Sequence, residues 1–111
     1  MAVIVKHTRD SRVEQSGTRG MRESLIAGPA AGCNKFTMKR ITLDENGRTA
    51  NTLFSRSTVY FIHQGSVALS HENGGLDPLK TGEAAVIHAD EEHFLKNLSR
   101  GKSIVLAVTA Q

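Results

Sequence analysis

The chain has 111 residues, of which 39% are hydrophobic and 23% charged, and a formal net charge of +3. This length suits one domain with one hydrophobic core, and the composition excludes a disordered chain. A single cysteine excludes an intrachain disulfide and favours a reducing compartment. The first residues lack the features of a signal peptide, and no apolar run approaches the ~20 residues of a membrane span. We therefore expect a cytoplasmic protein without a membrane partner.

Positive charge is concentrated in the first 40 residues, which hold eight Lys or Arg and three acidic residues. A basic segment can attract phosphates or other anions. These charges are spaced singly and form no block of five, which is typical of a solvated surface. We expect no nucleic-acid partner.

Short strands dominate the predicted elements. Residues 2–6 and 12–28 are candidates for two N-terminal strands or an irregular arm, with a weak helical signal at 11–15. Residues 35–43 alternate with a period of two, and Asn-Gly in the segment 44–47 predicts a tight turn because it readily adopts positive φ. Further strands are predicted at 58–62, 66–70, 84–88 and 103–109, with a second turn at 72–75. Many short strands with glycine-rich turns predict an all-β sandwich or barrel.

Residues 82–97 carry the most informative pattern, GEAAVIHADEEHFLKN. They keep Gly82, His93 and Asn97 at the spacing of G-x-x-x-x-x-P-x-G-x-x-H-x-x-x-N, the second sequence motif of the cupins. His88 stands in place of the motif's proline and Asp90 in place of its second glycine. Segment 46–65 has the length and closing glycine of the first cupin motif.

The chain thus resembles a small single-domain cupin of the conserved cupin 2 type over roughly residues 24–109. The resemblance implies an all-β jelly-roll barrel at 24–111, preceded at 1–23 by an N-terminal arm or strand. Small cupins often form dimers by exchanging N-terminal strands, so the resemblance also implies a homodimer in which this arm can cross to the partner.

The resemblance further implies a degenerate metal site without a cofactor. The four ligand positions of metal-bearing cupins align with Thr52, Phe54, Thr58 and His93. A threonine hydroxyl is a poor ligand beside imidazole or carboxylate, and phenylalanine cannot bind a metal. One alternative remains, a metal-dependent enzyme whose ligand set is rebuilt from other histidines. Of these, His63 faces away from Thr58 by strand alternation, His88 lies near the barrel mouth, His71 begins a turn and His7 lies in the arm.

The surviving positions predict a pocket of mixed character that binds a small organic molecule of unassigned identity. Its candidate residues are Thr52, Phe54, Thr58, Tyr60 and His93, with Asn97 and Arg40 as neighbours. An alternative is a metal-independent isomerase, epimerase or lyase, with His93 as general acid or base and Tyr60 as donor to a developing oxyanion. A third reading is structural, in which His93 hydrogen-bonds Thr52 or Thr58 inside a filled barrel.

Overall fold

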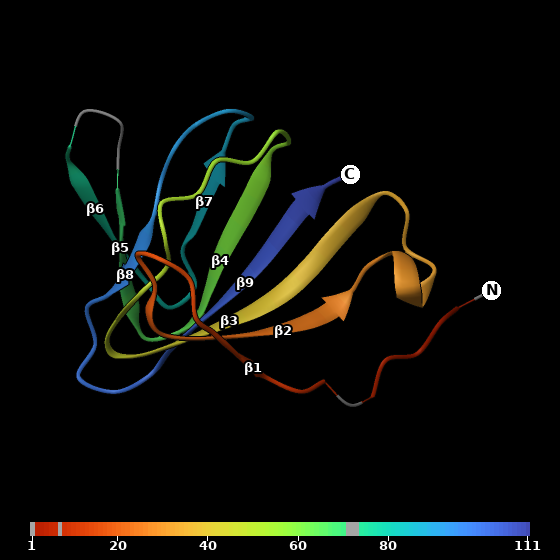
Figure 1. Ribbon diagram of the computed structural model, residues 1–111, viewed down its shortest axis with the longest axis horizontal. Coiled ribbons are helices and arrows are strands. Elements are labelled where there is room, and N and C mark those ends of the chain that lie inside the picture. Colours follow the sequence, from red (N-terminus) through yellow and green to blue (C-terminus); the bar gives the residue numbers. More distant parts are fainter. Residues whose placement is uncertain (1, 7, 71–73) are drawn as a thin grey trace.

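The computed structural model describes residues 2–6, 8–70 and 74–111, and its strands form one antiparallel sheet that curls into a nearly closed barrel (Figure 1). The strands are β1 (Ser11–Val13), β2 (Arg19–Ala27), β3 (Phe36–Arg48), β4 (Thr58–Gln64), β5 (Ser66–Ser70), β6 (Leu76–Lys80), β7 (Ala84–Ile87), β8 (Leu95–Asn97) and β9 (Ser103–Ala110). A short 3-10 helix, η1 (Pro29–Ala31), joins β2 to β3. Within the described residues, no helix is long and apolar enough to cross a membrane. The predicted all-β barrel is confirmed.

The long strand β3 connects the two ends of the barrel. The strand order is β6-β5-β8-β3-β9-β4-β7, and β2 pairs with β3 and with β1. Over most of its length β3 lies between β2 and β9, and at Arg48 it pairs with Lys96 of β8. Figure 1 shows β5, β6 and β8 at one side and β2, β3, β9 and β4 fanning towards the other. Strand β3 therefore links the β5–β6–β8 part of the sheet to the β2–β9–β4 part.

Alternation along β4 decides which side chains enter that interior. Thr58, Tyr60 and Ile62 are buried, whereas the residues between them are exposed. His63 is exposed, so the prediction that it faces away from Thr58 is confirmed. The core is completed by fully buried Leu43, Val67, Leu95 and Val105. Each such aliphatic side chain stabilises the fold by roughly 1.5 to 3 kcal/mol relative to exposure.

The predicted strands after residue 57 are confirmed, with ends within two residues of those expected, but the predicted turn at 44–47 is wrong. The chain does not reverse there, because β3 continues to Arg48. Pairing with β2 steps from Met21↔Leu43 to Arg19↔Arg48, so residues 44–47 form a bulge. Asn46 does have the positive φ that Asn-Gly predicts, at 60°.

Some other regions differ from the sequence-based expectation, and some of the predicted features lie outside the described residues. Residues 11–13 form β1 where a weak helical signal was read, and β6 and β8 were not predicted. Residues 72 and 73 of the turn predicted at 72–75 lie outside the described residues, and so do His7 and His71.

The N-terminal region pairs with its own chain. Strand β2 crosses the boundary expected between residues 23 and 24 and pairs with β3, while β1 pairs with β2. Residues 2–6 adopt no strand, and Val3, Ile4 and Val5 are exposed. The homodimer expected from the sequence stays a prediction.

Candidate functional site

A cavity of about 420 Å³ lies inside the barrel beneath β1 and β2. Met21, Ile41, Phe54 and Ala107 form much of its apolar wall. Its polar lining includes Tyr60 of β4, Glu23 of β2, Lys39 of β3, Thr52 and Thr109. Its volume is in the range of small-molecule sites. Its lining is more polar than is usual for such sites, because threonines and the charged pair face it together with the apolar residues.

Tyr60 and His93 form a buried hydrogen-bonded pair at this cavity. The Tyr60 hydroxyl lies 2.7 Å from Nε2 of His93, and Nδ1 of His93 lies 2.9 Å from the backbone oxygen of Glu91. A carbonyl oxygen can only accept, so Nδ1 carries the hydrogen of the neutral ring. Nε2 is then the acceptor, and the Tyr60 hydroxyl donates to it.

Backbone pairing places His93 opposite this hydroxyl. Thr52 and His93 form an isolated antiparallel bridge, with N–H···O distances of 2.7 and 3.0 Å. The bridge holds the segment before β8 against the connection between β3 and β4. The ring of Phe54 lies 6.0 Å from the His93 ring, and that of Tyr60 lies 5.4 Å away at 63°, an edge-to-face arrangement.

Tyr60, rather than His93, forms the wall of the cavity. His93 is only 3% exposed and is not among the described residues that line the cavity. Burial raises the pKa of the Tyr60 hydroxyl well above its usual value, and the negative charge of Glu23 raises it further. Tyr60 therefore stays protonated at neutral pH and meets a ligand as a neutral hydroxyl.

The structure brings together five of the seven residues predicted for the site. Thr52, Phe54 and Tyr60 line the cavity, and His93 lies behind Tyr60. Thr58 is fully buried, and its hydroxyl lies 3.0 Å from that of Thr109, a lining residue. Neither Thr52 nor Thr58 bonds to the His93 ring, because the ring's two nitrogens face Tyr60 and Glu91.

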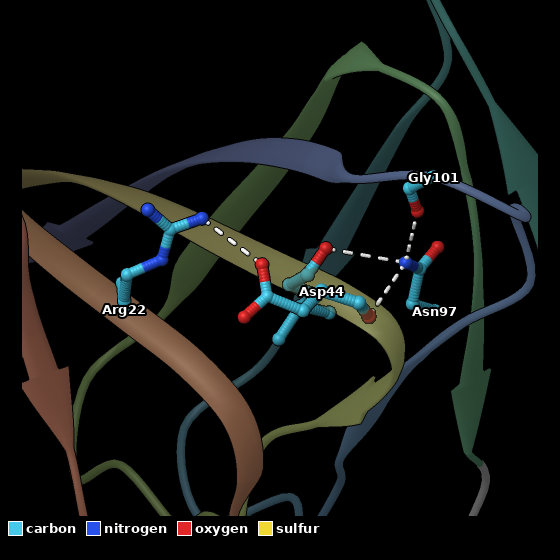
Figure 2. A network of polar contacts seen from close by, with 5 residues as sticks. Arg22, Asp44, Asn97 and Gly101 are labelled. Carbon is cyan, nitrogen blue, oxygen red and sulfur yellow. Dashed lines mark hydrogen bonds and ion pairs between the residues drawn. The ribbon is translucent and has the colours of Figure 1, made fainter.

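Asn97 lies elsewhere, in a buried polar network at one end of the barrel (Figure 2). Its Nδ2 lies 3.2, 2.8 and 2.8 Å from the backbone oxygens of Leu43, Asp44 and Gly101. Its Oδ1 accepts from the backbone N–H of Ser99 at 2.9 Å and from the Ser103 hydroxyl at 2.6 Å. Asn97 therefore fixes the β3 bulge and the loop before β9, and it does not line the cavity.

Arg40 also lies outside the cavity. It is on β3 between Lys39 and Ile41, which line the cavity, so alternation turns Arg40 to the opposite face. There its Nη2 pairs with Asp10 Oδ1 at 3.0 Å.

Sequence reasoning missed two charged lining residues, Glu23 and Lys39. Lys39 Nζ lies 3.2 Å from Glu23 Oε1, and their side chains are 40% and 31% exposed. At this exposure such a pair contributes little to stability. Lys39, Ile41 and Leu43 are spaced two residues apart along one strand, so alternation places Lys39 on the same face as these two apolar residues. That pattern indicates from the sequence that Lys39 points inward.

The four positions that hold a metal in metal-bearing cupins do not fit one here. Thr52, Phe54 and Thr58 offer two weak donors, and both His93 ring nitrogens have hydrogen-bond partners. Among the described residues, no group of three or more His, Cys, Asp or Glu is arranged to hold a metal ion. His88 is exposed and is not a lining residue.

The fold is shared with several solved structures of low sequence identity. The polyketide cyclase RemF from Streptomyces resistomycificus is 18% identical, with a TM-score of 0.88 over 99% of this chain and 80% of that one. A predicted oxalate decarboxylase from Thermotoga maritima is 20% identical, with a TM-score of 0.83 over 99% and 98%. An RmlC-like cupin from Shewanella frigidimarina is 13% identical, with a TM-score of 0.75 over 93% and 83%.

These neighbours define the class of fold. The chain is a β-barrel protein of the jelly-roll type that contains the cavity described above. More specifically, it has the fold of a small single-domain cupin, as its second motif predicts. The sequence matches no family model and no curated protein.

Proposed function

We propose that the barrel binds a small organic molecule in the cavity beside Tyr60. The observation that carries the proposal is the cavity itself, about 420 Å³ in volume, with the Tyr60 hydroxyl in its wall. Ligand pockets of roughly 300 to 1,000 Å³ are typical. The named activities of the fold neighbours, cyclase and decarboxylase, also concern small organic molecules, although they share no single substrate.

The polar lining indicates the chemistry of this ligand. The Tyr60 hydroxyl donates to His93, so its oxygen can accept a hydrogen bond from a ligand hydroxyl. Lys39 can leave Glu23 for a carboxylate or an ionised enol, since this ion pair is only partly buried and is still screened by solvent. Phe54, Met21 and Ile41 offer apolar contact. We therefore propose a hydroxylated ligand with an apolar body and one anionic group.

A second candidate is metal-independent acid–base catalysis by Tyr60 and His93. A substrate proton can pass to the Tyr60 oxygen while the Tyr60 proton moves to Nε2 of His93. The resulting imidazolium keeps its Nδ1–H bond to the Glu91 oxygen, which stabilises the added charge. In this scheme Tyr60 contacts the substrate and His93 acts through it, which reverses the contacts expected from the sequence. It keeps His93 as the base in an isomerase, epimerase or lyase.

A screen of small hydroxy acids and hydroxylated aromatic acids by ligand-detected NMR tests binding. We expect hits on the wild type that are lost in Ala107→Leu, because the larger side chain fills the cavity. The matched control is Ala84→Leu, whose site is exposed and does not line the cavity. Overpacking costs about 1 to 3 kcal/mol, so the folding of both variants is checked by thermal melting.

The outcomes separate the candidates. Compounds that bind wild type and Ala107→Leu equally, or a library that yields no binder, would contradict a cavity ligand. A bound compound that is converted by the wild type and left unchanged by Tyr60→Phe would favour catalysis over binding alone.

A further inference from the structure

Another pocket, of about 410 Å³, lies on the barrel beside the Asn97 network. It is formed by β1, β2, the β3 bulge and the loop before β9. Among the described residues that line it, Arg12, Arg22 and Lys102 are cationic, and Asp44 is the single acid. None of these charged residues lines the cavity beside Tyr60, although Met21 lines both pockets.

The two arginines are neighbours by strand register. Arg12 of β1 lies directly opposite Arg22 of β2. Residues directly opposite one another in an antiparallel pair have Cβ atoms about 4.5 to 5.5 Å apart, and like charges there destabilise the pairing. Arg12 pairs with Glu14 at 3.2 Å, but both side chains are more than 70% exposed, so this contact relieves little of the repulsion.

Arg22 is held in position and still has an unused donor. Its Nη2 donates to Asp44 Oδ1 at 3.0 Å, as Figure 2 shows. The backbone oxygen of Asp44 in turn accepts from Asn97, so the acid that orients Arg22 is itself fixed. The Nε–H of Arg22 is buried and has no hydrogen-bond partner in the described part of the chain. A buried donor without a partner is rare in folded proteins.

We propose that this pocket binds a phosphate group, either as the free ion or as the end of a small phosphate monoester. A tetrahedral anion with several terminal oxygens would offer Arg22 an acceptor and would screen the repulsion between Arg12 and Arg22. Guanidinium groups bind such oxygens in planar, paired geometry, and Lys102 adds a third positive charge at the rim. Asp44 neutralises one of three cations, so the pocket keeps a net positive charge.

The experiment follows the arginine Nε–H signals of the ¹⁵N-labelled 111-residue chain during titration with inorganic phosphate. Sodium chloride at equal ionic strength is the reference, and Arg22→Lys assigns the signal. We expect a saturable shift of the Arg22 Nε–H signal with phosphate and none with chloride. A parallel titration with glycerol 3-phosphate distinguishes the two sources, since tighter binding of the ester would favour a monoester.

Two variants make the test specific. Arg12→Gln is expected to weaken phosphate binding roughly tenfold or more, because one charged contact is lost. The same variant should melt at an equal or higher temperature in chloride, since it removes the like-charge pair. Arg56→Gln, an exposed position outside the pocket, is the matched control and should bind phosphate like the wild type. Equal shifts with phosphate and chloride, or equal phosphate affinity in Arg12→Gln, would overturn the proposal.

Discussion

Asn97→Asp is expected to destabilise the protein by about 3 to 5 kcal/mol at neutral pH, which is the range for leaving a buried charge uncompensated. The substitution keeps the shape of the side chain but replaces its NH₂ group with an oxygen. In the wild type this NH₂ group faces the backbone oxygens of Leu43, Asp44 and Gly101. The new oxygen of the carboxylate would be buried against three acceptors without a donor, while the other oxygen keeps its hydrogen bonds from Ser99 and Ser103.

The direction in which this destabilisation changes with pH follows from the pKa of the new carboxyl group. Burial against acceptors raises the pKa of the new carboxyl in the folded protein, so the unfolded chain releases its proton first. The destabilisation should therefore be small in acid, where both states are protonated, and should grow as the pH rises through the ordinary carboxyl range. Urea unfolding across pH measures it. The matched control is Asn34→Asp, at an exposed position. Equal stability of the two variants at pH 7 would show that the network does not hold this end of the barrel.

Gly47→Ala is expected to destabilise the fold by about 2 to 3 kcal/mol. A Cβ at residue 47 would lie 2.7 Å from the backbone oxygens of both Asp44 and Gly20, and 3.0 Å from that of Arg19. These are backbone atoms of two paired strands, so relieving the clash requires both a change within the β3 bulge, at Asp44, and a shift of β2 away from it. Alanine also lowers the entropy of the unfolded chain, but that gain of about 0.4 to 1 kcal/mol is smaller than the strain.

Gly101→Ala is the matched control for this prediction. A Cβ at Gly101 would meet nothing within 4 Å. The entropy gain is then unopposed, and we expect unchanged or slightly raised stability. Thermal and urea melts of the two variants measure the difference. Equal melting of Gly47→Ala and wild type would mean that the bulge adapts without strain.

The bulge also shows where local sequence signals fail. Asn46 and Gly47 have the residue types of a tight turn, and Asn46 does take positive φ. The chain continues nevertheless, because β3 hydrogen-bonds to β2 and β9 before the bulge and to β8 after it. Pairing between segments distant in sequence outweighs the local preference, and a single sequence does not reveal that pairing.

The missed strands have physical reasons of their own. β6 contains Pro78, which argues against a central strand, yet β6 lies at the edge of the sheet where proline is tolerated. β8 is only three residues long, too short for a periodic pattern. The strands rich in β-branched residues, β4 and β9, were predictable because both propensity and alternation indicate them.

For the candidate site, motif spacing indicated which residues lie close together better than it indicated what each side chain contacts. The register that aligns Thr52, Phe54 and His93 with cupin ligand positions places them around Tyr60, and the structure has them there. Spacing did not reveal that the Asn97 side-chain NH₂ group hydrogen-bonds to backbone oxygens. It also did not reveal the Glu23–Lys39 pair, whose partners are brought together by the β2–β3 register.

Long-range ¹H–¹⁵N NMR of the His93 ring tests most directly how Tyr60 and His93 are arranged. Spectra of the wild type at alkaline pH identify the ring nitrogen that carries the hydrogen. Tyr60→Phe assigns the nitrogen that faces the hydroxyl. We predict hydrogen on Nδ1 and an unprotonated Nε2 whose shift changes in Tyr60→Phe. A ring with hydrogen on Nε2, unaffected by Tyr60→Phe, would contradict the hydrogen bond on which the candidate site is built.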